Sequence, residues 1–282
     1  MDPVAALRGF GGVAHRATLE QRGVAGSELA RALQDHRIER PHRGLFVLPG
    51  TSAEQALACY FRARLTCVSA AAAWSLPLLE APEHVHLEVN SARGGRYARS
   101  AVREATVVHR FSNHEPGPWR VPVLRAIDVA SRCLDQVSQL ALVDAALERG
   151  QIQGGDLERL SITPARTAAF IRAQADPRAG SIAETFTRTC LRDAGFAVQS
   201  QVTFPRVGRV DFLVEGRVVV ECDGRQYHSG ERQFQTDRDR DRALLAQGVP
   251  VVRFTFADAV YRPEKVVAEV RKVLAALEGG RN

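Results

Sequence analysis

The sequence predicts an α/β protein with at least two domains, and three observations lead to this prediction. The chain has 282 residues and a mass of 30.9 kDa, which is enough for two or three hydrophobic cores. From residue 176 onward the pattern reads as helix, strand, strand, helix, strand and helix. Within that part, two apolar runs at 209–214 and 218–222 lie three residues apart and predict a β-hairpin.

The composition is that of an ordinary globular protein, with 45% hydrophobic and 25% charged residues. No segment has the apolar core of a signal peptide or the length of a membrane span, so we expect a cytoplasmic protein. The net charge of +6 rests on arginine, because lysine occurs only at Lys265 and Lys272. Arginine suits phosphate recognition, although GC-rich codon usage explains the same bias. The oligomeric state is not indicated.

The cysteines predict neither a disulfide framework nor a structural zinc site, because they are odd in number and form no CxxC pair. They are Cys59, Cys67, Cys133, Cys190 and Cys222. We expect them to be reduced and mostly buried. His84 and His86 lie on one face of a predicted strand, but the spacing places no third ligand beside them. We therefore expect these histidines to be structural.

Residues 1–50 predict a winged helix-turn-helix. Ser27 is a candidate N-cap, and apolar residues then recur at helical spacing. The segment "RPHRGLFVL" reads as a basic turn that enters a strand. In this interpretation the helix enters the major groove of DNA, and four basic side chains meet phosphates: Arg37, Arg40, His42 and Arg43. The alternative is a small helical domain with solvated arginines.

Residues 51–175 predict an α/β middle region that is rich in alanine. "EHVHLEVN" and "ATVVHRF" read as strands, and they flank a loop that carries Arg93, Arg96, Arg99 and Arg103. This loop either follows a nucleic-acid backbone or is a solvated connection. Two helices are then expected, the second ending at Gly150.

The predicted hairpin places carboxylates among apolar residues. A three-residue loop at 215–217 puts Asp211 directly opposite Glu221, with β-carbons about 4.5–5.5 Å apart, which lets both carboxylates hold one divalent cation. Asp223 projects from the same face, because strand side chains alternate. A two-residue loop would instead send Glu221 to the opposite face.

Three acids on one face repel one another unless a cation neutralises them or their pKa values rise. An exposed face with ordinary surface acids is the alternative. The apolar neighbours Phe212, Leu213 and 218–220 favour a buried hairpin and therefore a metal site.

Two segments in the C-terminal part of the chain resemble a known nuclease family. "VDFLVEGRVVVECDGRQYH" and "FQTDRDRDRALLAQGVPVVRFTF" resemble the very short patch repair endonuclease-like group of the PD-(D/E)xK nuclease superfamily, over about residues 176–282. The resemblance implies a restriction-endonuclease-like domain with a central mixed sheet flanked by helices. It implies hydrolysis of DNA phosphodiester bonds with Mg²⁺, or with Mn²⁺. The positions that match the family's site are Asp211, Glu221, Asp223, His228, Asp237 and Arg240.

Two of the implied roles stay open. Many nucleases of the superfamily have lysine where this chain has Asp223, although the group it resembles also lacks that lysine. His228 either shares the lysine's role as acid or base, or begins a helix. Glu184 matches the family's acid on the first helix, but it also stands three residues after Ser181, the spacing of a capping box.

The expected function is therefore that of a metal-dependent DNA endonuclease, in repair or phage defence. The carbonyl of Cys222 is expected to join Asp211 and Glu221 as a metal ligand. Residues 26–50 and "RLTCVSAAAAWSLPLL" also resemble, more weakly, the winged-helix domains of AbiEi-type antitoxins. The alternative function is a non-catalytic DNA-binding regulator or antitoxin whose nuclease-like domain is a scaffold.

Overall fold

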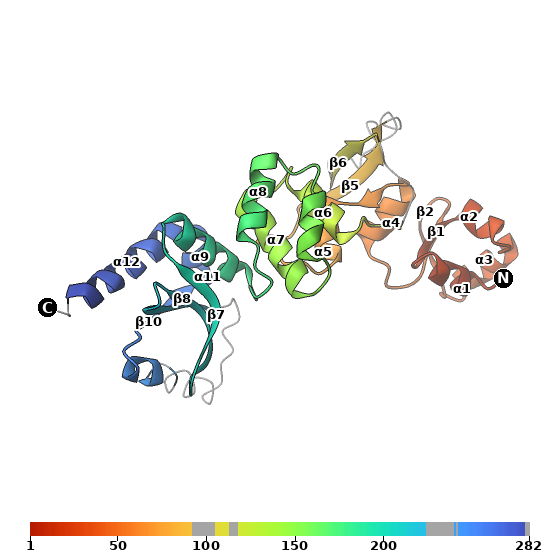
Figure 1. Ribbon diagram of the computed structural model, residues 1–282. Helices are drawn as coiled ribbons and strands as arrows, with labels where there is room; N and C mark the ends of the chain where they lie inside the picture. The colour runs from red at the N-terminus through yellow and green to blue at the C-terminus, as the bar shows by residue number, and fades with distance from the viewer. Residues whose placement is uncertain (92–104, 113–117, 224–239, 241, 280–282) are drawn as a thin grey trace. The chain divides into compact units, whose positions relative to one another are not determined.

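The computed structural model describes residues 1–91, 105–112, 118–223, 240 and 242–279 (Figure 1). The described chain divides into two compact units. Unit 1 comprises residues 1–76, 80–133 and 160–163, and unit 2 comprises residues 77–79, 134–159 and 164–282. The predicted boundaries near residues 50 and 175 stay predictions, and the basic loop that carries Arg93 to Arg103 lies outside the described residues. No described helix combines the length and apolar character that crossing a membrane requires.

The first part of unit 1 is a small helical core with a three-stranded sheet of order β1-β3-β2. Its elements are α1 (Pro3–Gly9), β1 (Val13–His15), α2 (Arg16–Gln21), α3 (Gly26–Gln34), β2 (Glu39–His42) and β3 (Leu45–Val47). The buried apolar core includes Leu7, Leu19, Leu29, Ile38 and Phe46.

The start of α3 differs from the prediction. The helix begins at Gly26, so Ser27 lies inside it and is not the N-cap. The carboxylate of Glu28 accepts the N–H of Ala25 at 2.8 Å and satisfies one donor at this end of the helix. Arg43 and Gly44 turn the chain from β2 into β3, and Gly44 has a φ of 77°, which favours glycine.

The second part of unit 1 is built on a sheet of order β4-β5-β6. Its elements are α4 (Ala53–Tyr60), β4 (Arg64–Leu65), α5 (Cys67–Ala73), β5 (Val85–Asn90), β6 (Thr106–Phe111) and α6 (Val123–Ala130). β5 pairs antiparallel with β4 and parallel with β6. The chain later returns to this unit, where the Asp128 carboxylate accepts backbone N–H groups of Ser161, Ile162 and Thr163 at 2.8–3.0 Å.

Unit 2 contains a four-stranded mixed sheet of order β10-β9-β8-β7. Its elements are α7 (Gln136–Glu148), η4 (Gly154–Arg159), α8 (Ala165–Gln174), α9 (Ile182–Asp193), β7 (Val198–Phe204), β8 (Gly208–Val214), β9 (Val218–Asp223), β10 (Val251–Thr255), α11 (Phe256–Tyr261) and α12 (Pro263–Gly279). β10 runs parallel to β9, whereas the other two strand pairs are antiparallel. A mixed sheet with helices is the architecture expected for this part of the chain.

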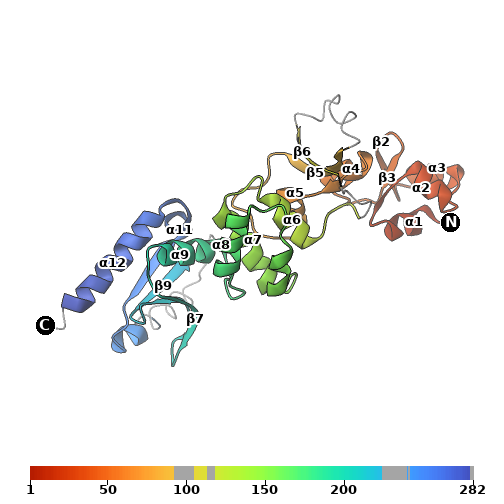
Figure 2. The same ribbon diagram turned by 45° about the horizontal axis from the view of Figure 1, so that its top comes forward.

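Both faces of this sheet are covered. One face packs Phe212, Val220 and Phe254 against apolar residues of α9 and α12. Figures 1 and 2 show these two helices on the same side of the sheet. The other face packs Val219 against Leu244, which lies in the helical segment 242–246. The strand β9 is therefore buried on both sides, which explains its continuous apolar run at residues 218–220.

The hairpin between β8 and β9 has the predicted three-residue loop. Val214 pairs with Val218, so that residues 215–217 form the connection. Glu215 and Gly216 have φ values of 51° and 64°, a conformation that only glycine adopts without strain. This register carries Asp211 and Glu221 toward facing positions at the far end of the hairpin.

Candidate functional site

Glu184 lies in the first turn of α9 and has two kinds of contact. The Ser181 hydroxyl accepts the N–H of Glu184 at 3.2 Å, and the Glu184 carboxylate accepts the N–H of Gly180 at 3.0 Å. Ser181 and Glu184 therefore form a variant of the predicted capping box, in which the glutamate accepts the N–H of Gly180 and not that of Ser181. The same carboxylate also accepts a hydrogen bond from Nε2 of Gln201 at 2.8 Å. Glu184 thus both stabilises its helix and faces β7.

Asp211 lies on β8, beside Gln201 of the neighbouring strand. Its Oδ2 accepts the N–H of Cys222 at 2.9 Å. The side chain of Asp211 thus bonds a backbone N–H of β9 that a strand carbonyl would otherwise accept. Burial raises the pKa of Asp211, although the hydrogen bonds from Cys222 and Gln201 lower it. Burial also raises the pKa of Glu184, and the charge of Asp211 raises it further. The carboxylates of Glu184 and Asp211 therefore lie close together, and their hydrogen bonds do not fully offset the cost of burying their charge.

The sequence interpretation missed Gln201, which joins these two acids. It donates to Glu184 and contributes a hydrogen bond to Asp211. Its backbone has a φ of 55°, which is uncommon for a residue other than glycine. No signal in the segment "VQSQVTF" separates this glutamine from Gln199, because both are polar residues of one strand. The strained backbone is visible only in the fold.

Glu221 has a different environment. Its carboxylate lies 3.1 Å from Nη2 of Arg253, which occupies the paired position on β10. Arg240 also contacts Glu221 at 3.4 Å, and it donates to the backbone carbonyls of Val207 and Arg209. Two guanidinium groups therefore compensate the charge of Glu221, while Asp211 receives no ion pair of comparable length among the described residues.

Cys222 contributes through its backbone and not through its thiol. Its Sγ donates to the Thr187 hydroxyl at 3.0 Å and packs with the apolar core of unit 2. Burial raises the pKa of this thiol, so the side chain stays protonated. The N–H of Cys222 fixes the position of Asp211.

The remaining predicted residues of this site lie at or beyond the end of the described segment. Asp223 ends β9, and nothing is described of its side chain, while His228 and Asp237 lie outside the described residues. Within the described ranges, the ligand atoms of Glu184, Asp211 and Glu221 do not all converge as a group of three. The structure thus brings Glu184 and Asp211 together and leaves Glu221 with its arginines.

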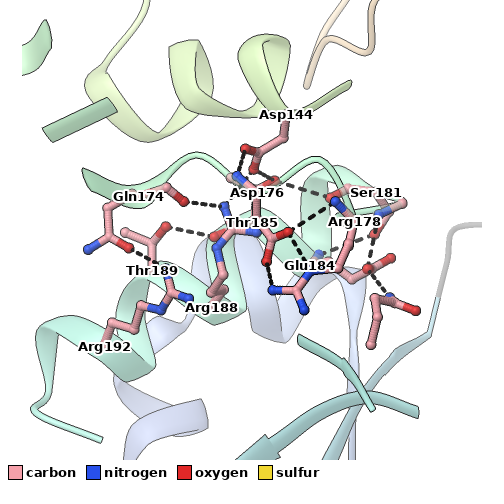
Figure 3. A network of polar contacts seen from close by, with 12 residues as sticks. Asp144, Gln174, Asp176, Arg178, Ser181, Glu184, Thr185, Arg188, Thr189 and Arg192 are labelled. Atoms are coloured by element: carbon pink, nitrogen blue, oxygen red, sulfur yellow. Dashed lines mark hydrogen bonds and ion pairs between the residues drawn. The ribbon is translucent and has the colours of Figure 1, made fainter. Parts of the chain in front are cut away.

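A buried polar network holds α9 against α7 (Figure 3). The Asp144 carboxylate accepts hydrogen bonds from Arg188 at 2.6 Å, from the Thr185 hydroxyl at 2.7 Å and from the N–H of Asp176 at 2.8 Å. The side chains of Arg188 and Asp144 are 0% and 1% exposed. Arg188 also donates to the Gln174 carbonyl at 3.1 Å.

The segment before α9 is fixed by the same network. Asp176 accepts two hydrogen bonds from the side chain of Arg178, at 2.9 and 3.0 Å, in the forked geometry that favours an arginine and a carboxylate. Figure 3 shows Glu184 at the edge of this network, one position before Thr185. The network therefore positions the helix that carries Glu184.

The basic residues predicted at the N-terminus lie on the hairpin of unit 1 and the turn before it. Arg37 forms an exposed ion pair with Asp2 at 2.5 Å. Arg40 and Arg43 are exposed, whereas the ring of His42 lies 4.4 Å from that of Tyr60. All three predicted arginines are thus on the surface, and Arg37 is paired there with an acid.

Comparisons with known proteins bear on unit 2. Residues 184–274 match the family model REase_MTES_1575, which describes a restriction endonuclease-like domain. The match begins at Glu184 and includes Asp211 and Glu221. No curated protein matches the chain.

A search of solved structures found similarity to the crystal structure of the RV2827C protein from Mycobacterium tuberculosis. That protein is 19% identical to this chain, with a TM-score of 0.27, over 69% of this chain and 76% of the other. Among these comparisons, the family match supports a similarity of residues 184–274 to a restriction endonuclease-like domain.

Proposed function

We propose that residues 176–282 form a DNA endonuclease domain that requires Mg²⁺ or Mn²⁺. The observation that carries the proposal is the pair formed by the buried Glu184 and the half-buried Asp211, joined by Gln201, inside a segment that matches a restriction endonuclease-like domain. A scaffold has no need of two neighbouring acids whose pKa values are raised by burial. The very short patch repair endonuclease-like group remains the proposed relative.

The residues of this pair fit a divalent cation. Burial disfavours the charged form of both Glu184 and Asp211, and a cation would compensate that charge. Carboxylate and carbonyl oxygens are the ligands that Mg²⁺ prefers, so the proposed set is Asp211, Glu221 and the carbonyl of Cys222. Glu221 can join this set only if it exchanges at least one arginine for the ion, since Arg240 and Arg253 contact it.

A divalent ion held by these residues would supply Lewis-acid activation of water and would stabilise the departing oxygen of the phosphodiester. The N–H of Cys222 fixes the orientation of Asp211. Gln201 and Gly180 hold Glu184. We assign His228 the role of general acid or base, and Asp223 a supporting acidic role, from the family resemblance. Arg240 is proposed to approach the DNA backbone when Glu221 releases it.

The domain is tested by incubating the purified full chain with supercoiled plasmid DNA. We expect nicked or linear products with Mg²⁺ or Mn²⁺ and no products with excess chelator. The metal must restore cleavage when it is returned in excess over the chelator. A chain that cuts equally with chelator, or that never cuts any duplex or mismatched DNA with either metal, would contradict the proposal.

We also propose that residues 1–50 form a winged helix-turn-helix that binds duplex DNA. The order of one helix, one strand, two helices and a hairpin supports this, with α3 as the helix for the major groove. The exposed Arg40 and Arg43 belong to the hairpin, which is the wing in this interpretation.

Replacing Arg40 and Arg43 with alanine is expected to weaken DNA binding and to flatten its salt dependence. Each phosphate contact that is lost removes about 0.9 from the slope of log K against log salt, so the double variant should lose up to about 1.8. Binding is measured by fluorescence anisotropy of the full chain without added Mg²⁺ or Mn²⁺, which prevents cleavage.

The matched control for this prediction replaces two exposed arginines of unit 2, Arg159 and Arg166, and removes the same charge. The control should keep most of the slope. Equal losses in the two variants would mean that the wing makes no specific phosphate contacts and that only net charge matters.

A second candidate function is a DNA-binding regulator or antitoxin whose nuclease-like domain is a scaffold. The observation that favours it is the ion pairing of Glu221, which gives this acid a structural partner on β10 and needs no metal. The plasmid assay separates the two candidates, because a regulator binds DNA through residues 1–50 but does not cleave it.

Replacing Glu184 with glutamine should separate capping from catalysis. Glutamine keeps an oxygen that accepts the N–H of Gly180, so the free energy of unfolding should change by less than about 1 kcal/mol. If Glu184 supports the metal site, plasmid cleavage should fall at least tenfold. Cleavage at the rate of the unaltered protein would leave helix capping as its role.

A further inference from the structure

Four potential metal ligands converge in unit 1, far from the acids in sequence. Cys67 begins α5, His86 lies on β5, His109 lies on β6, and Cys133 follows α6. One ligand atom from each side chain lies within 4.8 Å of the corresponding atoms of the other three. Together these residues are called the Cys/His cluster.

The fold explains why the two histidines meet. β5 and β6 are parallel neighbours, and the register pairs His86 with Val107 and Glu88 with His109. The two imidazoles therefore lie on the same face of the sheet, offset by two residues along the strands, with ring centroids 5.3 Å apart. Spacing along the sequence placed no third ligand beside His84 and His86, whereas the fold brings potential ligands to His86 from other elements and leaves His84 outside the group.

The distances suit a tetrahedral ion. Nδ1 of His86 lies 3.1 Å from Nε2 of His109, and Sγ of Cys133 lies 3.8 and 4.0 Å from these two nitrogens. In a tetrahedral zinc site with Zn–N bonds of about 2.0–2.1 Å and Zn–S bonds of about 2.3 Å, neighbouring ligand atoms lie roughly 3.3–3.8 Å apart. The side chains need only small adjustments to reach that geometry.

The environment also suits a bound metal. Cys67, His86 and His109 are buried, whereas Cys133 is exposed and leaves a side from which an ion can enter. Cys67 has a φ of 53°, an uncommon conformation for a residue with a side chain, and such conformations concentrate at functional sites.

We propose that unit 1 binds one zinc ion through Cys67, His86, His109 and Cys133. Two thiolates and two imidazoles are a donor set that zinc prefers, and four protein ligands leave no position for substrate, so the role is structural. Binding releases one proton from each thiol, and two thiolates with Zn²⁺ form a site of zero net charge. A neutral complex is compatible with burial. The proposal is independent of the nuclease assignment, which concerns unit 2.

The full chain, produced without a histidine tag in zinc-supplemented medium and purified with a phosphine reductant, tests this directly. Elemental analysis should give close to one zinc per chain. Cobalt exchanged into the protein should produce the intense visible absorption of tetrahedral Co²⁺ with thiolate charge-transfer bands. Both tryptophans, Trp74 and Trp119, lie in unit 1, so chelator should lower the midpoint of the thermal transition that tryptophan fluorescence reports.

Variants identify the ligands. Cys133→Ser changes an exposed position, so the protein should fold, yet zinc content should fall at least fivefold and the cobalt charge-transfer bands should weaken. His109→Asn should have the same effect on zinc content. Cys59→Ser and His84→Asn are the matched controls, because these residues lie outside the Cys/His cluster, and both should keep one zinc per chain.

Several outcomes would overturn the proposal. One is a folded parent chain that contains less than a tenth of an equivalent of zinc and takes up neither Zn²⁺ nor Co²⁺ under reducing conditions. Another is a disulfide between Cys67 and Cys133 that re-forms in preference to metal binding, which intact mass before and after reduction detects. Equal zinc loss in the cluster variants and in the controls would also reject these four ligands.

Discussion

Replacing Asp211 with asparagine is expected to reduce DNA cleavage by about 10³-fold while the protein stays folded and binds DNA. Loss of a charged metal ligand removes several kcal/mol of transition-state stabilisation, and each 1.36 kcal/mol corresponds to a factor of ten. Asparagine keeps an oxygen that can accept the N–H of Cys222, so the end of the hairpin is preserved. Single-turnover cleavage of plasmid DNA at saturating Mg²⁺ measures the effect.

The stability of this variant has a definite sign. Burial raises the pKa of Asp211, so the folded protein is penalised at pH values above that pKa, where the carboxylate must be charged. At pH 7 without metal, the asparagine variant should therefore be as stable as the unaltered protein or more stable. The difference should shrink as the pH falls through the folded pKa of Asp211, because the unaltered side chain then takes up its proton.

The control for this variant is Asp193→Asn, which makes the same chemical change at an exposed position of α9. It should cleave DNA at the rate of the unaltered protein. If the Asp211 variant also cleaves at that rate, or if it unfolds at neutral pH, then Asp211 serves the fold and the endonuclease proposal fails.

Glu221→Gln distinguishes the two candidate functions in another way. If Glu221 is a metal ligand, the Glu221→Gln variant should lose about as much cleavage as the Asp211→Asn variant. As the partner of Arg253 and Arg240 alone, it should lower stability modestly, because both guanidinium groups are partly exposed and such pairs contribute about 1 kcal/mol or less. The two measurements together show whether this acid exchanges its arginines for an ion.

The hairpin was the part of the fold that the sequence determined best. The segment Glu215–Gly216–Arg217 contains glycine where a left-handed backbone is needed, and the apolar runs on both sides fix the register. Local signals of this kind depend on a few adjacent residues. The neighbours of Glu221 could not be predicted in the same way, because Arg253 reaches it through a parallel strand that follows a long crossover.

The Cys/His cluster is even harder to predict from local sequence signals. Its members come from two helix boundaries and two strands, and their separations along the chain match no short ligand motif. Only the parallel pairing of β5 and β6 brings His86 beside His109. Gln201 is a similar case, because its role follows from the packing of β7 on α9 and from its backbone conformation. Tertiary structure, and not composition, creates both sites.

The buried ion pair of Asp144 and Arg188 should show an asymmetric response to mutation. Asp144→Ala leaves the guanidinium of Arg188 in the core without its carboxylate, and Nε and Nη1 of Arg188 already lack acceptors among the described residues. Breaking such a pair costs about 3–5 kcal/mol. Arg188→Met should cost less, because Asp144 keeps hydrogen bonds from Thr185 and Asp176 and can take up a proton.

Because both tryptophans lie in unit 1, the unfolding of unit 2 can be told apart from that of unit 1, and the different stability losses of the two variants can be measured. Far-ultraviolet circular dichroism follows both units during urea unfolding, whereas fluorescence of Trp74 and Trp119 follows unit 1. Asp144→Ala should shift the circular dichroism transition more than Arg188→Met does, and Asp193→Ala on α9 should shift it by less than about 0.5 kcal/mol. Because α9 carries Glu184, the Asp144 variant should also lose cleavage once unit 2 begins to unfold. Equal losses of stability in the Asp144 and Arg188 variants would mean that water or another group forms hydrogen bonds with Arg188 when Asp144 is absent. The loss of stability in Asp144→Ala would then not come from an unpaired charge.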